Sequence, residues 1–552
     1  MSKIEFIALG GLDEKGKNCY VLNINDNIFV INCGIFYPKY QILGLESSIP
    51  DFEYLKKNKE KIRGVFIGTP TEKNFGSLKY LMDEMTLPVY TTNINADIIN
   101  LSLNSNIQFN IVESMKSFEL NGIKITPFKI TNSLPNSVGF IFADGNENII
   151  FLDDCVISSS KAPALANDVL TIIPILNNKN NLLFTGVGAV STTNSFVSPN
   201  FQTQTYFNDL FNENDDRVII ALYSFEMYKI TSILNAAAMS GKVVAFTNVK
   251  THALILKMHQ YGLLPTFDKY KIVDLATLTN NEKNVVVIID AFPHAFFTMM
   301  SDICDEQNPD LIINSNDTFI FASQTINGLE KKEAELFDLV NKCNAKSSLK
   351  IDKKYLDLIP GVEDLKFMAA FIKPKYIVPV NALYMDFVNY QTAMSKTGFL
   401  KKNVVILRNG QKMIINDGVI NEKTEFVDLN SKLINTQGFI DENDSSILER
   451  TQMKDNGALI ISYVINTTQK KMIKAKYDNV GVIGQTPQNT NIINTINNEV
   501  NADVNKVLID LLSNKDRIDT KEFKLIVRKL IVKQYEKKFD KKPLVMMSLI
   551  FE

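Results

Sequence analysis

Apolar runs of strand length alternate with polar turns over residues 3–200. The runs are rich in Val, Ile, Phe and Tyr, and Gly, Asn and Asp bound them, which is the pattern of buried or half-buried strands. They are IEFIAL, CYVLNI, NIFVIN, GVFIGT, KITPFKI, VGFIFA and NIIFLD. We therefore expect a strand-rich segment over residues 1–205.

Residues 206–355 show a different pattern, in which apolar strands alternate with helical segments. RVIIALY precedes a helix through Ala236–Ala238, KVVAFT precedes a helix containing ALILKMHQYG, and NVVVIID and DTFIFAS are further strands. This alternation predicts a doubly wound α/β domain. Residues 356–420 resume the pattern of residues 1–205 and contain a helix at VEDLKFMAAFI and a strand at KYIVPV.

The last quarter of the chain divides into a polar and a folded part. Residues 421–456 are rich in Asp, Asn and Ser without a core pattern, and we expect a linker there. Residues 457–552 contain the strands ALIISYVI and PLVMMSLIF and the helices NADVNKVLIDLL and KEFKLIVRKLIVKQYEKKF. They predict a small α+β domain.

Composition places the chain among ordinary globular proteins with several domains. Its 552 residues are 45% apolar and 22% charged, and this length suggests about three to four domains. The longest apolar runs are far too short to span a membrane, and the start, MSKIEFIALGG, lacks the features of a signal peptide. We expect a cytoplasmic protein without membrane attachment.

The cysteines and histidines do not form a metal-binding pattern along the sequence. The five cysteines are far apart, without a CxxC pair, and we expect reduced, mostly buried thiols. The three histidines are His252, His259 and His294. The first two share a face of a predicted helix, where a surface or core role is the simpler interpretation.

The charge balance excludes a protein that is basic throughout. The net charge is −2, so any contact with RNA must come from a local patch. The segment Lys515–Lys542 holds eleven Lys or Arg against five acidic residues. It is either a patch for RNA or an acidic partner, or the solvated face of an amphipathic helix, which we favour.

The segments, taken in order, resemble ribonuclease J, a bacterial nuclease family with a metallo-β-lactamase fold and a β-CASP insertion. The matching stretches are LGGLDEKGKNCYVL, VINCGIFYP, IPDFEYL, FIGTPTEKNFGSLKYL, TNSLPNS, FLDDCV, DTFIFASQTINGLE and PKYIVPVNALY. The resemblance implies a metallo-β-lactamase αββα sandwich over 1–205 and 356–420 and an inserted β-CASP domain over 206–355. It also implies that the small C-terminal domain, 457–552, serves oligomerisation.

The resemblance places neutral or cationic residues where the family binds metal. Its zinc motif H-x-H-x-D-H falls on Thr69, Thr71, Lys73 and Asn74, two further histidines fall on Asn132 and Asn381, and Asp154 would retain the bridging aspartate. The family hydrolyses phosphodiesters with two zinc ions. One carboxylate cannot hold two divalent ions, so we expect no metal cofactor.

Lys73 replaces a carboxylate by an ammonium at the centre of this site. We predict that it contacts Asp154; the alternative is that Lys73 points into solvent and Asp154 bonds to backbone. An oxygen-only Mg²⁺ or Mn²⁺ site from Glu72, Asp153, Asp154 and Asp51 is a further alternative. It is disfavoured because Glu72 is expected to face outward, and Asp153 and Asp154, adjacent on a strand, are expected to face opposite ways.

The resemblance also implies that the phosphate-handling parts of the family are weakened in this chain. Ser224, Ser323 and Gly328 are weak candidates for RNA phosphate contacts, and turn chemistry explains them as well. Asn248 lies where the family tends to carry an arginine, and LDLIPG (356–361) replaces its phosphate-cradling Ser-Gly-His sequence.

Three functions follow from the resemblance. The first is a catalytically inactive accessory paralogue that pairs with an active ribonuclease J, as a homo- or hetero-oligomer, in RNA decay or processing. The second is a working 5′–3′ exo- or endoribonuclease with an unorthodox metal site. The third is an RNA-binding module that uses the old substrate groove.

Overall fold

The computed structural model divides into two compact units, residues 1–40 with 47–432, and residues 41–46 with 433–552. The residues that it describes are 2–37, 47–158, 162–191, 196–197, 202–279, 282–326, 329–352, 358–421, 425–430, 432–435, 438–441, 444–484, 486–513 and 519–552. None of the helices in these ranges is both long enough and apolar enough to cross a membrane.

Two sheets form a sandwich in the first unit. The first has the order β21-β20-β1-β2-β3-β5-β6-β7, with β22 beside β20. Its strands are β1 Lys3–Gly10, β2 Cys19–Ile24, β3 Asn27–Ile31, β5 Ile62–Phe66, β6 Val89–Thr91, β7 Phe109–Ile111, β20 Gln411–Asn416, β21 Val419–Ile420 and β22 Glu425–Phe426. The segment from β3 to β7 is parallel and the rest is antiparallel.

The second sheet has the order β19-β12-β11-β10-β9-β8. Its strands are β8 Phe118–Leu120, β9 Ile123–Lys129, β10 Val138–Asp144, β11 Glu147–Leu152, β12 Asn180–Gly186 and β19 Tyr376–Val380. One core joins the facing surfaces of the two sheets. Phe6 of the first sheet lies 4.4 Å, between ring centroids, from Phe184 of the second.

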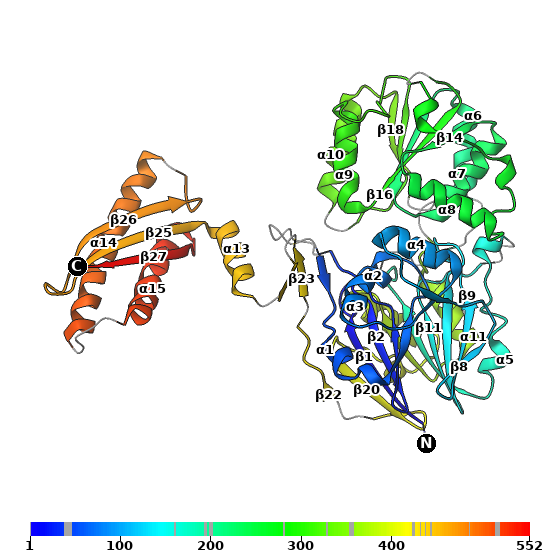
Figure 1. Ribbon diagram of the computed structural model, residues 1–552, viewed down its shortest axis with the longest axis horizontal. Coiled ribbons are helices and arrows are strands. Elements are labelled where there is room, and N and C mark those ends of the chain that lie inside the picture. Colours follow the sequence, from blue (N-terminus) through cyan, green and yellow to red (C-terminus); the bar gives the residue numbers. More distant parts are fainter. Residues whose placement is uncertain are drawn as a thin grey trace. The chain divides into compact units, whose positions relative to one another are not determined.

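Helices flank this sandwich on both sides (Figure 1). They are α1 Glu53–Lys57, α2 Glu72–Phe75, α3 Leu78–Glu84, α4 Asn93–Leu103, α5 Ile173–Leu176, α11 Val362–Ile372 and α12 Tyr384–Ser395. α11 and α12 belong to the stretch that follows the inserted domain, and their apolar faces join the core of the sandwich. The predicted αββα architecture is confirmed.

The inserted segment forms an all-parallel sheet in the order β15-β14-β16-β13-β17-β18. Its strands are β13 Val218–Tyr223, β14 Val243–Phe246, β15 Lys271–Val273, β16 Val285–Ala291, β17 Thr318–Phe321 and β18 Ser347–Lys350. Its helices are α6 Gln202–Glu213, α7 Met227–Met239, α8 Val249–Gln260, α9 Pro293–Cys304 and α10 Glu330–Lys342. One core packs α6, α7 and α8 on one face of the sheet, and another packs α9 and α10 on the other, so the predicted doubly wound topology is confirmed.

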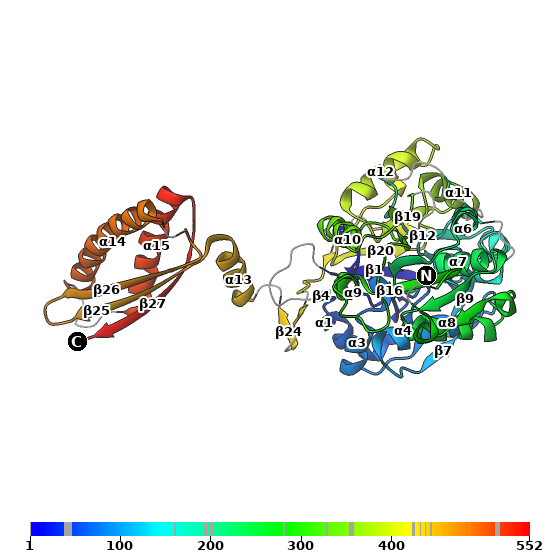
Figure 2. The same ribbon diagram turned by 90° about the horizontal axis from the view of Figure 1, so that it is seen from above.

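The second unit contains a three-stranded sheet, β26-β25-β27. Its elements are α13 Ser445–Asn456, β25 Ala458–Asn466, β26 Lys471–Val480, α14 Pro487–Ser513, α15 Thr520–Phe539 and β27 Leu544–Phe551. α14 and α15 pack on one face of the sheet (Figure 2). The stretch expected as a linker carries α13, whose Ile447 is buried, together with β23 Lys432–Asn435 and β24 Gly438–Asp441.

Candidate functional site

Loops that follow strands of both sheets converge at one edge of the sandwich. Asn32 follows β3, the loop 67–71 follows β5, Asp153 and Asp154 follow β11, and Asn381 follows β19. The carboxyl ends of parallel strands share an edge, and functional side chains are commonly presented there. Asn32 and Asn381 have φ angles of 63° and 56°, in the left-handed region that Asn tolerates better than most residues.

The predicted contact between Lys73 and Asp154 is present. Lys73 Nζ donates to Asp154 Oδ2 at 2.6 Å, and their side chains are 30% and 13% exposed. The alternative, with Lys73 directed into solvent, is wrong. A Cβ atom on Gly186, at the end of β12, would lie 2.9 Å from Asp154 Oδ1 and 3.8 Å from Asn381 Nδ2, so Asn381 borders the same spot.

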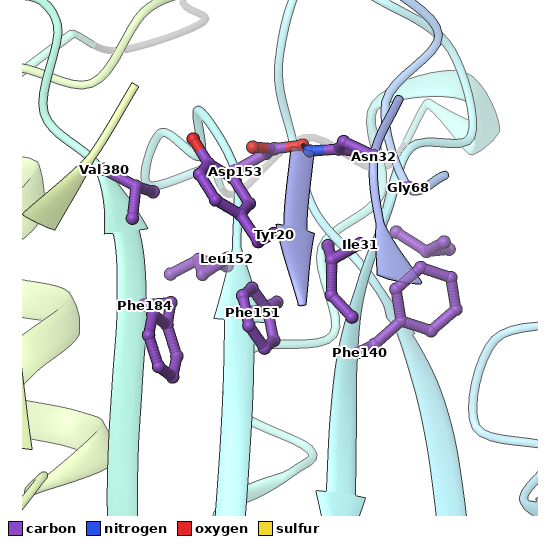
Figure 3. Close-up of a pocket in the computed structure, with 11 residues that line it drawn as sticks. Tyr20, Ile31, Asn32, Gly68, Phe140, Phe151, Leu152, Asp153, Phe184 and Val380 are labelled. Carbon is purple, nitrogen blue, oxygen red and sulfur yellow. Dashed lines mark hydrogen bonds between the residues drawn. The ribbon is translucent and has the colours of Figure 1, made fainter. Parts of the chain in front are cut away.

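Asp153 also lies in this site, although it was expected to face away from Asp154. Its Oδ2 accepts hydrogen bonds from Asn74 Nδ2 at 3.0 Å and from Asn32 Nδ2 at 3.4 Å; Figure 3 shows Asp153 beside Asn32. The expectation that Asp153 and Asp154 face opposite ways is wrong, because β11 ends at Leu152 and both carboxylates lie in the following loop.

The surroundings of Asp153 destabilise its charged form. Burial, and then the neighbouring charge of Asp154, raise its pKa from 3.8 to about 6, although Lys73 and the amides of Asn32 and Asn74 act in the opposite direction. A carboxyl in this range titrates near neutral pH.

Three amide and hydroxyl groups, at positions that the resemblance matches to metal ligands, bond to one another or to the loop backbone. Asn132 Nδ2 donates to Thr69 Oγ1 at 3.2 Å, and Asn132 Oδ1 accepts from Ser137 Oγ at 3.0 Å. Asn74 Nδ2 also donates to the carbonyl oxygen of Thr69 at 3.0 Å. These bonds hold the loops in place through neutral groups.

Thr71 takes a different position from the other matched residues. It is the residue before α2, and its carbonyl oxygen accepts from the backbone of Asn74 at 2.8 Å.

Glu72 and Asp51 do not join the two aspartates. Glu72 was expected to face outward, but it is half-buried and accepts a hydrogen bond from the Tyr37 hydroxyl at 3.2 Å; burial raises its pKa to about 7. Asp51 is buried and accepts from the backbone amides of Glu53 and Asn430. Within the described ranges, no three His, Cys, Asp or Glu side chains cluster in a way that could hold a metal ion.

A small cavity lies beneath Asp153 (Figure 3). Its volume is about 10 Å³, and Asn32, Asp153 and Tyr20 line it together with apolar side chains, among them Phe151. A space of this size holds about one water molecule, so the interior of the site is filled mainly by its own side chains.

The hydroxyl groups of Ser323 and Ser224, two of the candidate phosphate contacts, are buried within the inserted domain. Ser323 is fully buried; its hydroxyl donates to Glu226 at 2.8 Å and accepts from the amide of Tyr223. The hydroxyl oxygen of Ser224 is buried too.

Asn248 caps α8 and donates to Asp290 at 3.0 Å. Burial raises the pKa of Asp290 to about 6. Gly328, and Asp357 of the replaced phosphate cradle, lie outside the described residues.

Comparison with known proteins identifies relatives along most of the chain. A family model described as the β-CASP domain of ribonuclease J matches residues 215–342. The chain is 29% identical to an uncharacterized protein of Mycoplasma genitalium, with both chains covered completely. It is 23% identical to ribonuclease J 2 of Streptococcus pyogenes over 88% of each chain, and 24% identical to ribonuclease J2 of Bacillus subtilis over 85% of each.

A solved structure shows the same fold at lower identity. The crystal structure of a protein of unknown function from Enterococcus faecalis matches with a TM-score of 0.53 and 12% identity, over 75% of this chain and all of that one. At this identity the match supports the fold alone.

Proposed function

Because this chain belongs to the ribonuclease J family and is similar to its J2 members, we propose that it acts in RNA decay or processing as a catalytically inactive subunit. Its partner would be an active ribonuclease J. The observation that carries the first half of this proposal is the ion pair between Lys73 and Asp154 at the place of the family's metal site.

The two zinc ions of the family do not fit these residues. Zinc in proteins takes Cys, His, Asp or Glu ligands at about 2.0–2.3 Å, and Asp154 is the one matched position that offers such a group. Its Oδ2 is in contact with an ammonium at 2.6 Å, which repels a dication. We therefore derive no hydrolytic step from this site.

The remaining polar groups stabilise the loops without a metal. Asn32 and Asn74 donate to the half-buried Asp153, and Asn132 bonds to Thr69. A buried carboxylate needs a cation or hydrogen-bond donors nearby. Lys73 and these amides supply both, so the site retains its shape while its chemistry is structural.

The second half of the proposal, a partner role, is supported by an open face of the C-terminal sheet. α14 and α15 cover one face. On the other, Ile460 of β25 is paired with Met546 of β27, and Val464 with Ile550. Ile460, Met546 and Ile550 are 42%, 42% and 51% exposed. Exposed apolar side chains gathered on one sheet face can mark an association surface, which fits a domain that serves oligomerisation.

The proposal is tested by activity and by capture. The purified full-length chain should leave 5′-monophosphorylated RNA intact with Mg²⁺, Mn²⁺ or Zn²⁺, and a tagged copy recovered from its own cells should bring an active ribonuclease J with it. Robust exonuclease activity would overturn the inactive role. Recovery of the chain without a ribonuclease J would overturn the partner role.

A further inference from the structure

Two cysteines that are far apart in the sequence meet in the inserted domain. Cys304 is the last residue of α9, and Cys343 follows the last residue of α10. The Cys343 thiol donates to the carbonyl oxygen of Cys304 at 3.5 Å, and the two thiols are close enough to interact with each other. Both are reduced and only partly buried.

We propose that Cys304 and Cys343 are a modification site, a dithiol that a hydroperoxide converts to a reversible disulfide between α9 and α10. The proposal goes beyond the proposed function and does not depend on it. α9 and α10 pack against each other on one face of the parallel sheet, so a bond between their last turns would fasten that helix layer.

The surroundings of Cys304 disfavour its thiolate form. Burial, and then the adjacent Cys343, raise the pKa of Cys304 to about 12. Since the thiolate is the nucleophile in thiol chemistry, the pair reacts through whichever thiol loses its proton, and the other thiol resolves the product.

The reaction balances with hydrogen peroxide as the oxidant. The thiolate of one cysteine attacks one oxygen, the O–O bond breaks, and hydroxide leaves, which gives a sulfenic acid at that cysteine. The sulfur of the other cysteine then displaces the hydroxyl group, which leaves as water with the proton of the second thiol, and the S–S bond forms. Overall, two thiols and one hydrogen peroxide give one disulfide and two water molecules.

The same chain offers an internal control. Cys19 and Cys33 also lie against each other, but both are fully buried, and Cys33 contacts the Ser77 hydroxyl at 3.2 Å. Cys155 is buried as well. The thiols of Cys19 and Cys33 are adjacent but closed to a peroxide, so this pair should stay reduced. The thiols of Cys304 and Cys343 are adjacent and partly exposed, so this pair should react.

The test is peptide mapping of the reduced full-length protein after limiting hydrogen peroxide and alkylation. We expect a cross-linked peptide that contains Cys304 and Cys343, its loss after dithiothreitol, and full alkylation of Cys19, Cys33 and Cys155 after denaturation. Cys304→Ser should abolish the cross-link and accumulate a sulfenic acid at Cys343 that dimedone traps. Cys155→Ser should cross-link like the wild type.

Two results would overturn the proposal. One is oxidation of Cys155 as fast as that of Cys304 and Cys343, without a cross-linked peptide. The other is irreversible sulfinic acid at Cys343 as the first product in the wild-type chain. Both are read on the wild-type protein, so neither depends on whether a variant folds.

Discussion

Lys73 Nζ and Asp154 Oδ2 lie 2.6 Å apart at the edge of the sandwich where loops from both sheets meet. The two residues are far apart in the sequence, one in α2 and the other after β11. A cation thus contacts the carboxylate that the resemblance places at the bridging position of the family's metal site, and the pair ties the two sheets together at this edge.

The first prediction concerns the strength of this pair. Lys73→Met should lower the free energy of unfolding by about 1–3 kcal/mol, because it leaves Asp153 and Asp154 side by side without a cation; the partial exposure of Lys73 reduces the figure expected for a fully buried pair. The double variant with Asp154→Asn should be less destabilised than the sum of the two single changes, by about 1–2 kcal/mol. Denaturant unfolding of the four proteins measures this coupling.

An exposed ion pair elsewhere in the same sandwich is the matched control. Lys61 contacts Asp26 at 2.7 Å, with side chains 47% and 77% exposed. Lys61→Met should leave the unfolding midpoint unchanged, since solvent screens such pairs. Additive effects at positions 73 and 154 would contradict the account.

The second prediction is a pH dependence that comes from Asp153. Its pKa is raised from 3.8 to about 6 by burial first, so the folded protein holds a proton that the unfolded chain has already released. Its contribution to stability is therefore full below about pH 4 and is lost as the pH rises to about 6. Relative to Asp153→Asn, the wild type should lose about 2–3 kcal/mol over this range.

Unfolding measured at several pH values tests this difference. Asp83→Asn, at an exposed position of α3, serves as the control and should follow the wild type. Parallel curves for the wild type and Asp153→Asn between pH 4 and 6 would show that the carboxyl is not buried as described.

The third prediction concerns the close approach of two loops at the site. A Cβ atom on Gly34 would lie 1.6 Å from the carbonyl oxygen of Lys73, and backbone cannot yield by that much. Gly34→Ala should destabilise the protein by about 3 kcal/mol or more. A Cβ atom on Gly484 would have no neighbour within 4 Å, so Gly484→Ala should not destabilise the protein. Thermal unfolding distinguishes them, and equal midpoints would refute the tight packing around Lys73.

The fourth prediction concerns association through the C-terminal sheet. Ile460→Asp combined with Met546→Asp should weaken assembly by about a hundredfold or more, because charges replace two neighbouring apolar side chains of that face. Light scattering over a concentration series measures the change. Leu525→Asp is the control, since Leu525 is 55% exposed on α15, the helical side of the same unit; if it weakens assembly equally, the sheet face is not the interface.

Much of the fold follows from the sequence because its signals are local. The buried strands of the inserted domain, such as Val285–Ala291, are continuous apolar runs that alternate with helical patterns, and this alternation determines the doubly wound topology. The Lys73–Asp154 pair was also predictable, because the family resemblance places both residues at one site and opposite charges attract there.

The features that the sequence did not predict depend on where an element ends or on contacts between distant segments. Asp153 and Asp154 alternate in direction only if the strand continues through them, and β11 ends at Leu152. The meeting of Cys304 with Cys343 depends on the packing of α9 against α10, for which no local pattern exists. α13 was missed because its segment is polar and buries little beyond Ile447.

The central claim is that the ammonium of Lys73 and its neutral neighbours leave no place for a pair of zinc ions. Elemental analysis of the full-length protein, after equilibration with excess zinc and removal of free metal, tests it most directly. We expect zinc far below one ion per chain. Retention of about two zinc ions per chain, as the two-metal chemistry of the family requires, would contradict it.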